Sequence, residues 1–315
     1  MGRVRRLFEQ VYSTALEREI DEPPTHVAVI QDGNRRFAKR QGQPAPQGHR
    51  AGAQTTEQIL EWCHELGIEE LTLYAFSTEN FDRPREELEP LFDLVTEKLY
   101  EFADADEIDE QEVSIKAIGD IDRLPTRVRE AVEYAESRTE AYDRFRLNVA
   151  LAYGGRSELL TAAQEIAEAV AAGDLEPQDI DTQTVDRCLY GSEIRNVDLI
   201  IRTGGNERTS NFLPWHANGN EAAVVFKSPY WPEFNKIDFL RAIRTYQYRE
   251  RDWEQTKLRR AIDIVRSFGD LELGEARRII TAEQRERTPT EASKKAPGSL
   301  SELTESRSGS PETTD

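Results

Sequence analysis

Two patterns of hydrophobic and polar residues alternate along most of the chain. Short apolar runs rich in β-branched residues, typical of buried strands, are separated by longer segments with apolar residues every three or four positions, typical of helices. The pattern predicts strands at 26–31, 71–76, 113–118, 145–152, 197–201 and 221–226, and helices at about 49–66, 85–104, 125–140 and 156–172. This alternation predicts an α/β fold, a single domain with a mostly parallel central sheet flanked by helices.

The ends of the chain differ from this central part. Apolar residues in the first 20 positions fall on one helical stripe, which predicts an N-terminal amphipathic helix within 1–24. That helix either packs on its own domain or touches a membrane surface. No linker interrupts the stretch 25–280, which we interpret as the functional domain, whereas 281–315 is rich in Thr, Ser, Glu and Pro and is predicted to be disordered.

Composition narrows the classes of function. The net charge of −19 and the isoelectric point near 4.8 argue against nucleic acid as a partner. Eight lysines against 33 arginines, with this acidic excess, are what a protein of a high-salt cytoplasm shows. The chain has no long apolar span, and Cys63 and Cys188 lack metal-ligand spacing, so we expect a cytoplasmic protein, with peripheral membrane contact left open. The acidic run 104–112 lacks a calcium-loop pattern and is predicted to be a solvated loop.

Polar and cationic residues follow three of the predicted strands. The first strand leads into Asp32 and Gly33 and then into an arginine-rich helix start; the second leads into the polar cluster 77–84. The predicted strand 197–201 leads into 202–211, which holds two arginines and two adjacent glycines. Because parallel strands end at the same edge of a sheet, these segments predict one shared site for anions and a divalent cation.

Together these segments resemble the cis-prenyltransferase family, the undecaprenyl and dehydrodolichyl diphosphate synthases. The resemblance runs from about residue 26 to 253 and includes Gly48-His49-Arg50-Ala51-Gly52, Ala152-Tyr153-Gly154-Gly155-Arg156 and Pro229-Tyr230-Trp231-Pro232-Glu233-Phe234. It implies an enzyme that condenses isopentenyl diphosphate in cis onto an allylic diphosphate, with a hydrophobic tunnel enclosed in part by the helix at 85–104. The acidic composition and the Asn-Phe-Leu-Pro-Trp-His variant indicate the archaeal branch, whose members extend geranylgeranyl diphosphate to the long-chain precursor of a glycosyl carrier lipid.

The resemblance also implies roles for individual residues. Asp32 and Asn80 are expected to be catalytic, and Asp32 and Glu221 are expected to bind Mg²⁺ through hard oxygen ligands. As an amide, Asn80 is a poor base, so it is expected to orient water or phosphate. The substrate-binding residues implied are Gly33, Asn34, Arg35, Arg36, Phe37, His49, Ser77, Thr78, Glu79, Phe81, Arg83, Arg202, Arg208, Thr209 and Ser210.

Some positions depart from the family's common pattern. Phe37 and Phe81 stand where many relatives have tryptophan, Ala45 where an arginine is frequent, and Asn206 where a glutamate is common. Loss of the arginine at Ala45 removes one expected phosphate contact. None of these departures removes an expected catalytic or metal-binding residue.

The expected assembly is a homodimer, and two other functions stay open. The family includes noncatalytic partner subunits, which lack the carboxylate that follows the first strand, whereas Asp32 is present here. A strand-end aspartate also begins the mechanism of metal-dependent phosphohydrolases, but the further acids or catalytic lysine that such enzymes need at other strand ends are not found.

Overall fold

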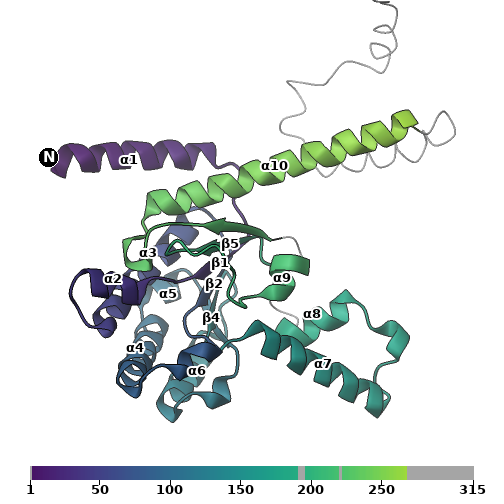
Figure 1. Ribbon diagram of the computed structural model, residues 1–315, viewed down its shortest axis with the longest axis horizontal. Coiled ribbons are helices and arrows are strands. Elements are labelled where there is room, and N and C mark those ends of the chain that lie inside the picture. The colour runs from purple at the N-terminus through teal and green to yellow at the C-terminus, as the bar shows by residue number, and fades with distance from the viewer. Residues whose placement is uncertain (1, 191–195, 220–221, 268–315) are drawn as a thin grey trace, which may run out of the picture. The chain divides into compact units, whose positions relative to one another are not determined.

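The central sheet has six parallel strands. The computed structural model describes residues 2–190, 196–219 and 222–267, and the residues up to Glu250 form one compact unit (Figure 1). The strands are β1 (His26–Ile30), β2 (Glu70–Tyr74), β3 (Val113–Ile118), β4 (Phe145–Ala150), β5 (Leu199–Arg202) and β6 (Ala223–Phe226). Their order is β3-β4-β2-β1-β5-β6 and each neighbouring pair is parallel, so the predicted α/β sheet is confirmed.

Helices connect the strands and flank the sheet. The α-helices are α1 (Gly2–Glu19), α2 (Asn34–Arg40), α3 (Ala45–Glu65), α4 (Arg85–Ala103), α5 (Asp106–Glu110), α6 (Thr126–Thr139), α7 (Gly155–Ala172), α8 (Thr182–Tyr190), α9 (Pro214–Gly219) and α10 (Lys236–Ser267). Short 3₁₀ helices are η1 (Thr78–Asp82), η2 (Ile121–Arg123), η3 (Pro177–Asp179) and η4 (Trp231–Glu233). None of the helices in the described ranges is both long and apolar enough to cross a membrane.

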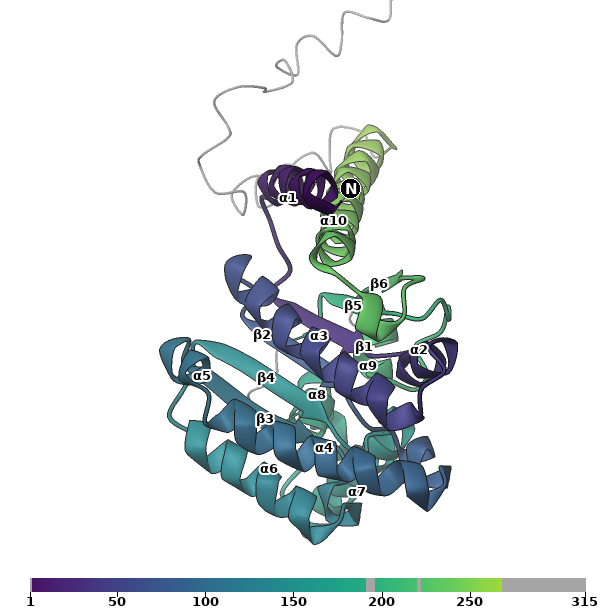
Figure 2. The same cartoon turned by 90° about the vertical axis from the view of Figure 1, so that its left-hand side faces the viewer.

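Both faces of the sheet are covered. In Figure 2, α3, α4 and α6 lie in front of the sheet and α7 and α8 lie behind it. Alternate residues of β1 serve the two layers: Val27 and Val29 join the core cluster that contains Ile59 of α3, whereas Ala28 and Ile30 join the one around Phe212. Burial on both faces explains why the strands read as continuous apolar runs.

Some details of the sequence prediction differ from the structure. The acidic run 104–112 was predicted to be a loop, but it contains α5, because Ile108 is buried in the core and fixes that turn. The acids Asp106 and Glu107 lie in the first turn of α5, where the helix dipole favours negative charge. The predicted strand 145–152 ends earlier, at Ala150. The predicted tail 281–315 lies outside the described residues.

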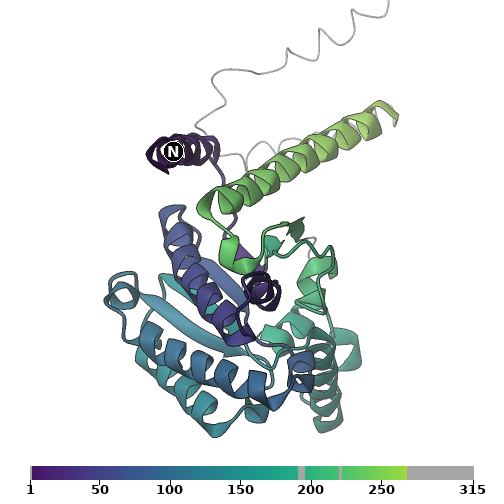
Figure 3. The same ribbon diagram turned by 60° about the vertical axis from the view of Figure 1, so that its left-hand side comes forward.

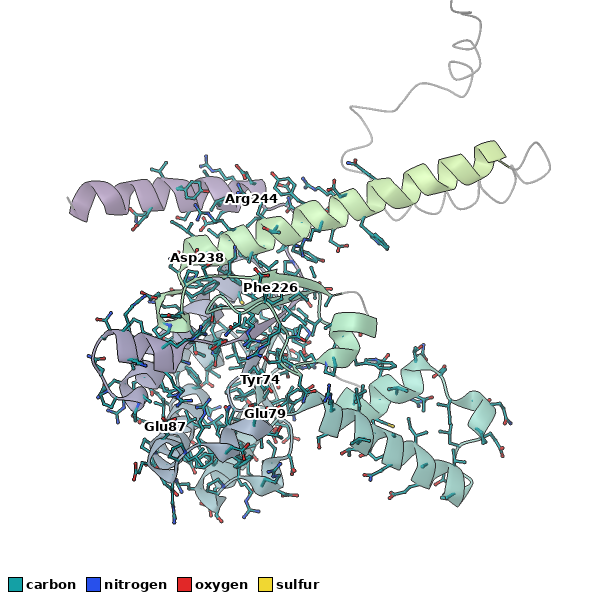
Figure 4. All side chains as sticks on the ribbon, viewed as in Figure 1. Tyr74, Glu79, Glu87, Phe226, Asp238 and Arg244 are labelled. Carbon is teal, nitrogen blue, oxygen red and sulfur yellow. The ribbon has the colours of Figure 1, made fainter. Side chains whose placement is uncertain are left out.

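The N-terminal helix contacts the start of α10. Leu16 of α1 is buried, Glu19 accepts a hydrogen bond from Arg244 at 2.9 Å, and the Gln247 side chain donates to the Glu19 carbonyl at 3.0 Å. Figure 4 shows Arg244 between the two helices. The end of α1 therefore packs on its own domain, which is one of the two alternatives that the sequence left open.

The strand order reverses beside β1. This strand pairs with β2 on one side and β5 on the other, and its last residue, Ile30, is in register with Arg202 of β5. Loops that leave such neighbouring strands turn in opposite directions, and the crevice between them is where ligands bind in open α/β sheets. The fold therefore brings the loop after β1 and the loop after β5 together.

A partly buried carboxyl lies where β4 leads into α7. Glu158, in the first turn of α7, accepts a hydrogen bond from the Tyr153 hydroxyl at 2.5 Å. Burial raises the pKa of Glu158 to about 7, although the Tyr153 hydrogen bond acts in the opposite direction. Tyr153 in turn packs edge-on against Tyr74 of β2, with ring centroids 5.7 Å apart.

We therefore predict that Glu158 makes stability depend on pH. Its folded pKa lies above the unfolded value of 4.5, so the folded protein binds more protons between the two values, and stability falls as pH rises through that range. Glu158→Gln should raise the melting temperature near pH 8 and much less near pH 5, with an upper limit of ~1.4 kcal/mol per unit of pKa shift. Thermal melts at both pH values test this, and equal shifts at the two would contradict it.

Candidate active site

A cavity of about 850 Å³ opens at the carboxyl edge of the sheet and extends between the sheet and α4. Polar and charged residues from the loops after β1, β2 and β5 line one part of it. Apolar residues of α4, β2 and β4 line the rest: Leu91, Leu94, Val95, Leu99, Phe102, Leu73, Leu147 and Val149. Figure 3 shows α3, in indigo, and α4, in blue, running over the same face of the sheet. The cavity therefore joins a place for anions to a place for hydrocarbon.

Asp32 lies at the centre of the charged part. Its carboxylate accepts hydrogen bonds from Arg36 at 2.9 Å, from Arg202 at 2.8 Å and from the Asn206 side-chain amide at 2.8 Å. Burial alone would raise the pKa of Asp32, but the bonds from Arg202 and Asn206 and the charge of Arg36 lower it overall. Asp32 is therefore held as a carboxylate by groups from two loops.

The loop after β1 turns at Gly33. This glycine has a φ of +109°, and a Cβ atom there would lie 2.7 Å from the Tyr230 ring, so both backbone and space require glycine. The turn starts α2, and the first N–H groups of a helix, which have no partner within it, are suited to bind an anion. Arg36 adds its guanidinium, which lies over the Tyr230 ring at 5.1 Å and donates to the Gly204 carbonyl at 2.8 Å.

Arg202 anchors the loop after β5. Besides Asp32, its guanidinium donates to the Ser210 hydroxyl and to the Arg208 carbonyl, so it draws 202–210 into a tight curve. Gly204 and Gly205 have positive φ within that curve. The Nε atom of Arg202 is buried and has no hydrogen-bond partner among the described residues. A buried guanidinium with a spare donor is suited to bind a phosphate oxygen.

The Gly154-Gly155 pair holds this loop in place. The Gly155 N–H donates to the Asn211 carbonyl at 3.0 Å, and the Arg156 N–H donates to the Asn211 side chain at 2.9 Å. A Cβ atom on Gly155 would lie 2.2 Å from the Pro214 ring. The motif thus fixes the loop after β5 by close backbone approach, a role that the sequence did not indicate.

Asn80 stabilises the loop after β2. Its side-chain oxygen accepts the Ser77 N–H at 3.2 Å, and the two residues form a capping box at the start of η1. Asn80 also lines the cavity. Because its oxygen is engaged in the turn, the amide is suited to position neighbouring groups and not to accept a proton. Figure 4 shows Glu79, on η1, near Tyr74 at the end of β2.

Several cationic side chains line a second cavity of about 510 Å³, which shares residues with the first. His49, Arg35 and Arg83 all line it, and burial together with the charges of Arg83 and Arg35 lowers the pKa of His49 to about 4. The imidazole is therefore neutral at pH 7 and can both donate and accept. Burial and the charge of Arg35 also lower the pKa of Arg83, although the charges of Glu87 and Asp32 act in the opposite direction.

Most of the residues expected from the sequence meet in this region. Those that line the larger cavity are Asp32, Asn34, Arg36, His49, Ser77, Glu79, Asn80, Arg83, Arg202, Arg208 and Ser210. Gly33 and Arg35 line the second cavity. Phe37, Thr78, Phe81 and Thr209 line neither, and Phe81 instead packs against Phe76 with ring centroids 4.9 Å apart. Glu221 lies outside the described residues.

A metal at this site would depend on Asp32. The ranges that the structure describes contain no group of three or more His, Cys, Asp or Glu side chains able to hold a metal ion. Mg²⁺ does not need such a group, since it is usually bound by one or two carboxylates together with waters and phosphate oxygens. Asp32, an ionised carboxylate beside anion-binding arginines, fits that mode of binding.

The comparisons with known proteins agree on one family. The family model described as "Putative undecaprenyl diphosphate synthase" matches residues 30–254. A geranylgeranyl-diphosphate-specific tritrans,polycis-undecaprenyl-diphosphate synthase of Halobacterium salinarum is 63% identical over 270 residues, 86% of this chain and 89% of that protein. The synthase of the same name from Methanocaldococcus jannaschii is 47% identical over 250 residues, 79% of this chain and 88% of that protein.

A solved structure has the same fold. Lavandulyl diphosphate synthase from Lavandula x intermedia, in complex with dimethylallyl diphosphate, superposes with a TM-score of 0.68 at 34% sequence identity. The match covers 71% of this chain and 95% of that one.

The hydrogen bonds of Asp32 predict how its loss affects stability. Asp32→Ala leaves the guanidiniums of Arg36 and Arg202 facing one another without a carboxylate, which should cost about 1–3 kcal/mol at low salt. Added salt or inorganic diphosphate should recover part of that loss by screening or occupying the cationic site. Chemical denaturation at several salt concentrations measures this, and a loss independent of both additions would contradict the electrostatic explanation.

Proposed function

The chain belongs to the undecaprenyl diphosphate synthase family of cis-prenyltransferases, and we propose that it extends geranylgeranyl diphosphate with isopentenyl diphosphate units to a long-chain polyprenyl diphosphate. The observation that carries this proposal is the cavity itself, which has cationic groups at one part and apolar walls along the other. A substrate with a diphosphate head and a hydrocarbon tail matches both parts. The names of the similar archaeal synthases support the choice of primer.

The allylic diphosphate binds at the first cradle, which we assign to the start of α2. Backbone N–H groups there, Arg36 and the neutral His49 surround the position of the head group. Arg35 and Arg83 add positive charge on the side of the second cavity. Charge on the leaving diphosphate grows as the allylic carbon–oxygen bond breaks, so these donors stabilise the transition state more than the bound substrate.

Isopentenyl diphosphate binds at the second cradle, formed by Arg202, Arg208 and Ser210. Arg202 and Arg208 both line the cavity, and their guanidinium groups are suited to phosphate oxygens. The Asn211 contacts with α7 fix this loop, which keeps the isopentenyl double bond close to the allylic carbon. Asn80 and Ser77, between the two cradles, position the groups near which the proton is lost.

Mg²⁺ is the proposed cofactor, with Asp32 and Glu221 as its protein ligands. When bound, it neutralises negative charge on the diphosphate. Asp32 is suited to bind a cation because its hydrogen-bond donors lower the pKa of the carboxyl and keep it ionised.

The apolar part of the cavity receives the growing chain, as the tunnel of a cis-prenyltransferase does. Its walls exclude water from the reacting carbons, which prevents capture of the allylic cation by water. The product, a precursor of a glycosyl carrier lipid, is hydrophobic, and we propose that a homodimer in a salt-rich cytoplasm delivers it to the membrane surface. A noncatalytic role has no support, because Asp32 and both arginine-bearing loops are present.

The direct test is a condensation assay. Purified protein is incubated with labelled isopentenyl diphosphate, Mg²⁺ and, in turn, dimethylallyl, geranyl, farnesyl or geranylgeranyl diphosphate, and the products are separated by chain length. We expect long-chain products with the highest kcat/KM for geranylgeranyl diphosphate, and a fall on the order of 10²-fold or more for Asp32→Ala.

Asp238→Ala is the matched control, since this carboxylate lies at the start of α10, away from the cavity-lining residues Tyr74 and Glu79 (Figure 4). It should retain the wild-type rate. Absence of a chain product with every primer would reject the proposed activity, and EDTA-insensitive turnover would reject the metal.

A further inference from the structure

Lys98 differs from the other α4 residues along the cavity. Leu91, Leu94, Val95, Leu99 and Phe102 of α4 also line it, and all of them are apolar. Among the lining residues that α4 contributes, Lys98 alone carries a charge. An unpaired charge in an apolar wall would be costly, so the position of the Lys98 ammonium group matters.

The ammonium group of Lys98 pairs with two carboxylates. Its Nζ lies 2.8 Å from Glu57 of α3 and 2.6 Å from Glu101 of α4. The Lys98 side chain is 22% exposed and the two glutamates are 44% and 55% exposed, so the charged ends meet at the protein surface. The aliphatic stem therefore forms the wall, and the ion pair with Glu57 joins α3 to α4 outside it.

The position of Lys98 along α4 determines which part of the cavity lies beside the ion pair. α4 begins just after η1, beside the charged part of the site, and Lys98 lies seven residues beyond Leu91, or about 10 Å further along the helix axis. A hydrocarbon chain that extends from the diphosphate cradles along α4 passes Leu91 before it reaches Lys98. The ion pair thus lies beside the far part of the cavity.

The wall that carries Lys98 is suited to move. Pro90 lies inside α4 and removes one hydrogen bond of the helix, and the Thr96 hydroxyl donates to the Phe92 carbonyl at 2.8 Å, a contact that bends helices. A partly exposed ion pair is weak and is screened by salt. The contact between α3 and α4 at this point can therefore open at small cost.

We propose that Lys98 and Glu57 form a latch that closes the side of the cavity between α3 and α4, and that this latch determines the length of the product. Elongation slows once the next addition would force the chain end against the closed wall. This inference rests on the proposed prenyl transfer and makes Lys98 a specificity-determining residue for it.

Three changes test the latch by product chromatography. Lys98→Met keeps the apolar stem and removes the charge, and Glu57→Gln removes the partner without altering a residue of the cavity. Both should shift the main product to chains longer by one or more isoprene units. Exchange of the two charges, Lys98→Glu with Glu57→Lys, should return the product toward the wild-type length, whereas Lys98→Glu alone should lengthen it.

Lys236→Met is the matched control. The Lys236 ammonium also pairs with two glutamates, Glu17 and Glu65, at 2.8 and 2.5 Å, and its side chain is 29% exposed, but it does not line the cavity. Its loss should leave the product length unchanged. Melting curves of all variants separate effects on stability from effects on length.

The outcomes distinguish this inference from the function on which it rests. If the wild-type protein makes no polyprenyl product, the proposed function fails. If the wild type makes polyprenyl products and either Lys98→Met or Glu57→Gln gives the wild-type length or shorter chains, the latch is overturned. Longer products from both, with rescue by charge exchange, support it.

Discussion

The charged site depends on one carboxylate shared between two neighbouring strands. Ile30 and Arg202 are in register in β1 and β5, so Asp32 and the Arg202 guanidinium meet just beyond the edge of the sheet at 2.8 Å. Arg36, from α2 at the end of the loop after β1, and Asn206, from the loop after β5, donate hydrogen bonds to the same carboxylate. Like charges would otherwise separate these loops, because Arg36 and Arg202 both carry positive charge. The Asp32 carboxylate therefore keeps the two cationic loops close together.

Backbone fit supports this electrostatic arrangement. Gly33 lets the loop after β1 pass against Tyr230, and Gly155 lets α7 approach the loop after β5, where Asn211 is bound. Both loops are thereby fixed without ligand, so little ordering is required when a diphosphate binds. The apolar half of the cavity is built differently, from the faces of α4 and the sheet, and its side wall is closed by side chains that can separate. A rigid charged end and an adjustable apolar end suit a reaction in which the head groups keep their positions and the chain lengthens.

The sequence predicted the parts of the fold that repeat with a regular period. Continuous apolar runs predicted all six strands, and the polar residues after them predicted where Asp32 and Arg202 would meet. The start of α2 was predicted after Gly33, but this short helix has no apolar stripe, so its extent was not. The sequence does not show which way a loop side chain points, and Phe81, expected at the site, packs against the core cluster. Asn206 was noticed only as a departure, since its bond to Asp32 joins residues 174 positions apart. Periodicity could not show that a charged residue, Lys98, lines the apolar part of the cavity.

The division of the cavity into two anion cradles is tested most directly by steady-state kinetics of Arg208→Ala with both substrates varied. Arg208 lines the cavity in the loop after β5 and makes no contact with Asp32 through its side chain in the described structure, so its loss should spare the first cradle. The account predicts a KM for isopentenyl diphosphate raised by about tenfold or more, a lower kcat and an unchanged KM for the allylic diphosphate. A rise confined to the KM of the allylic substrate would contradict the assignment of the two cradles.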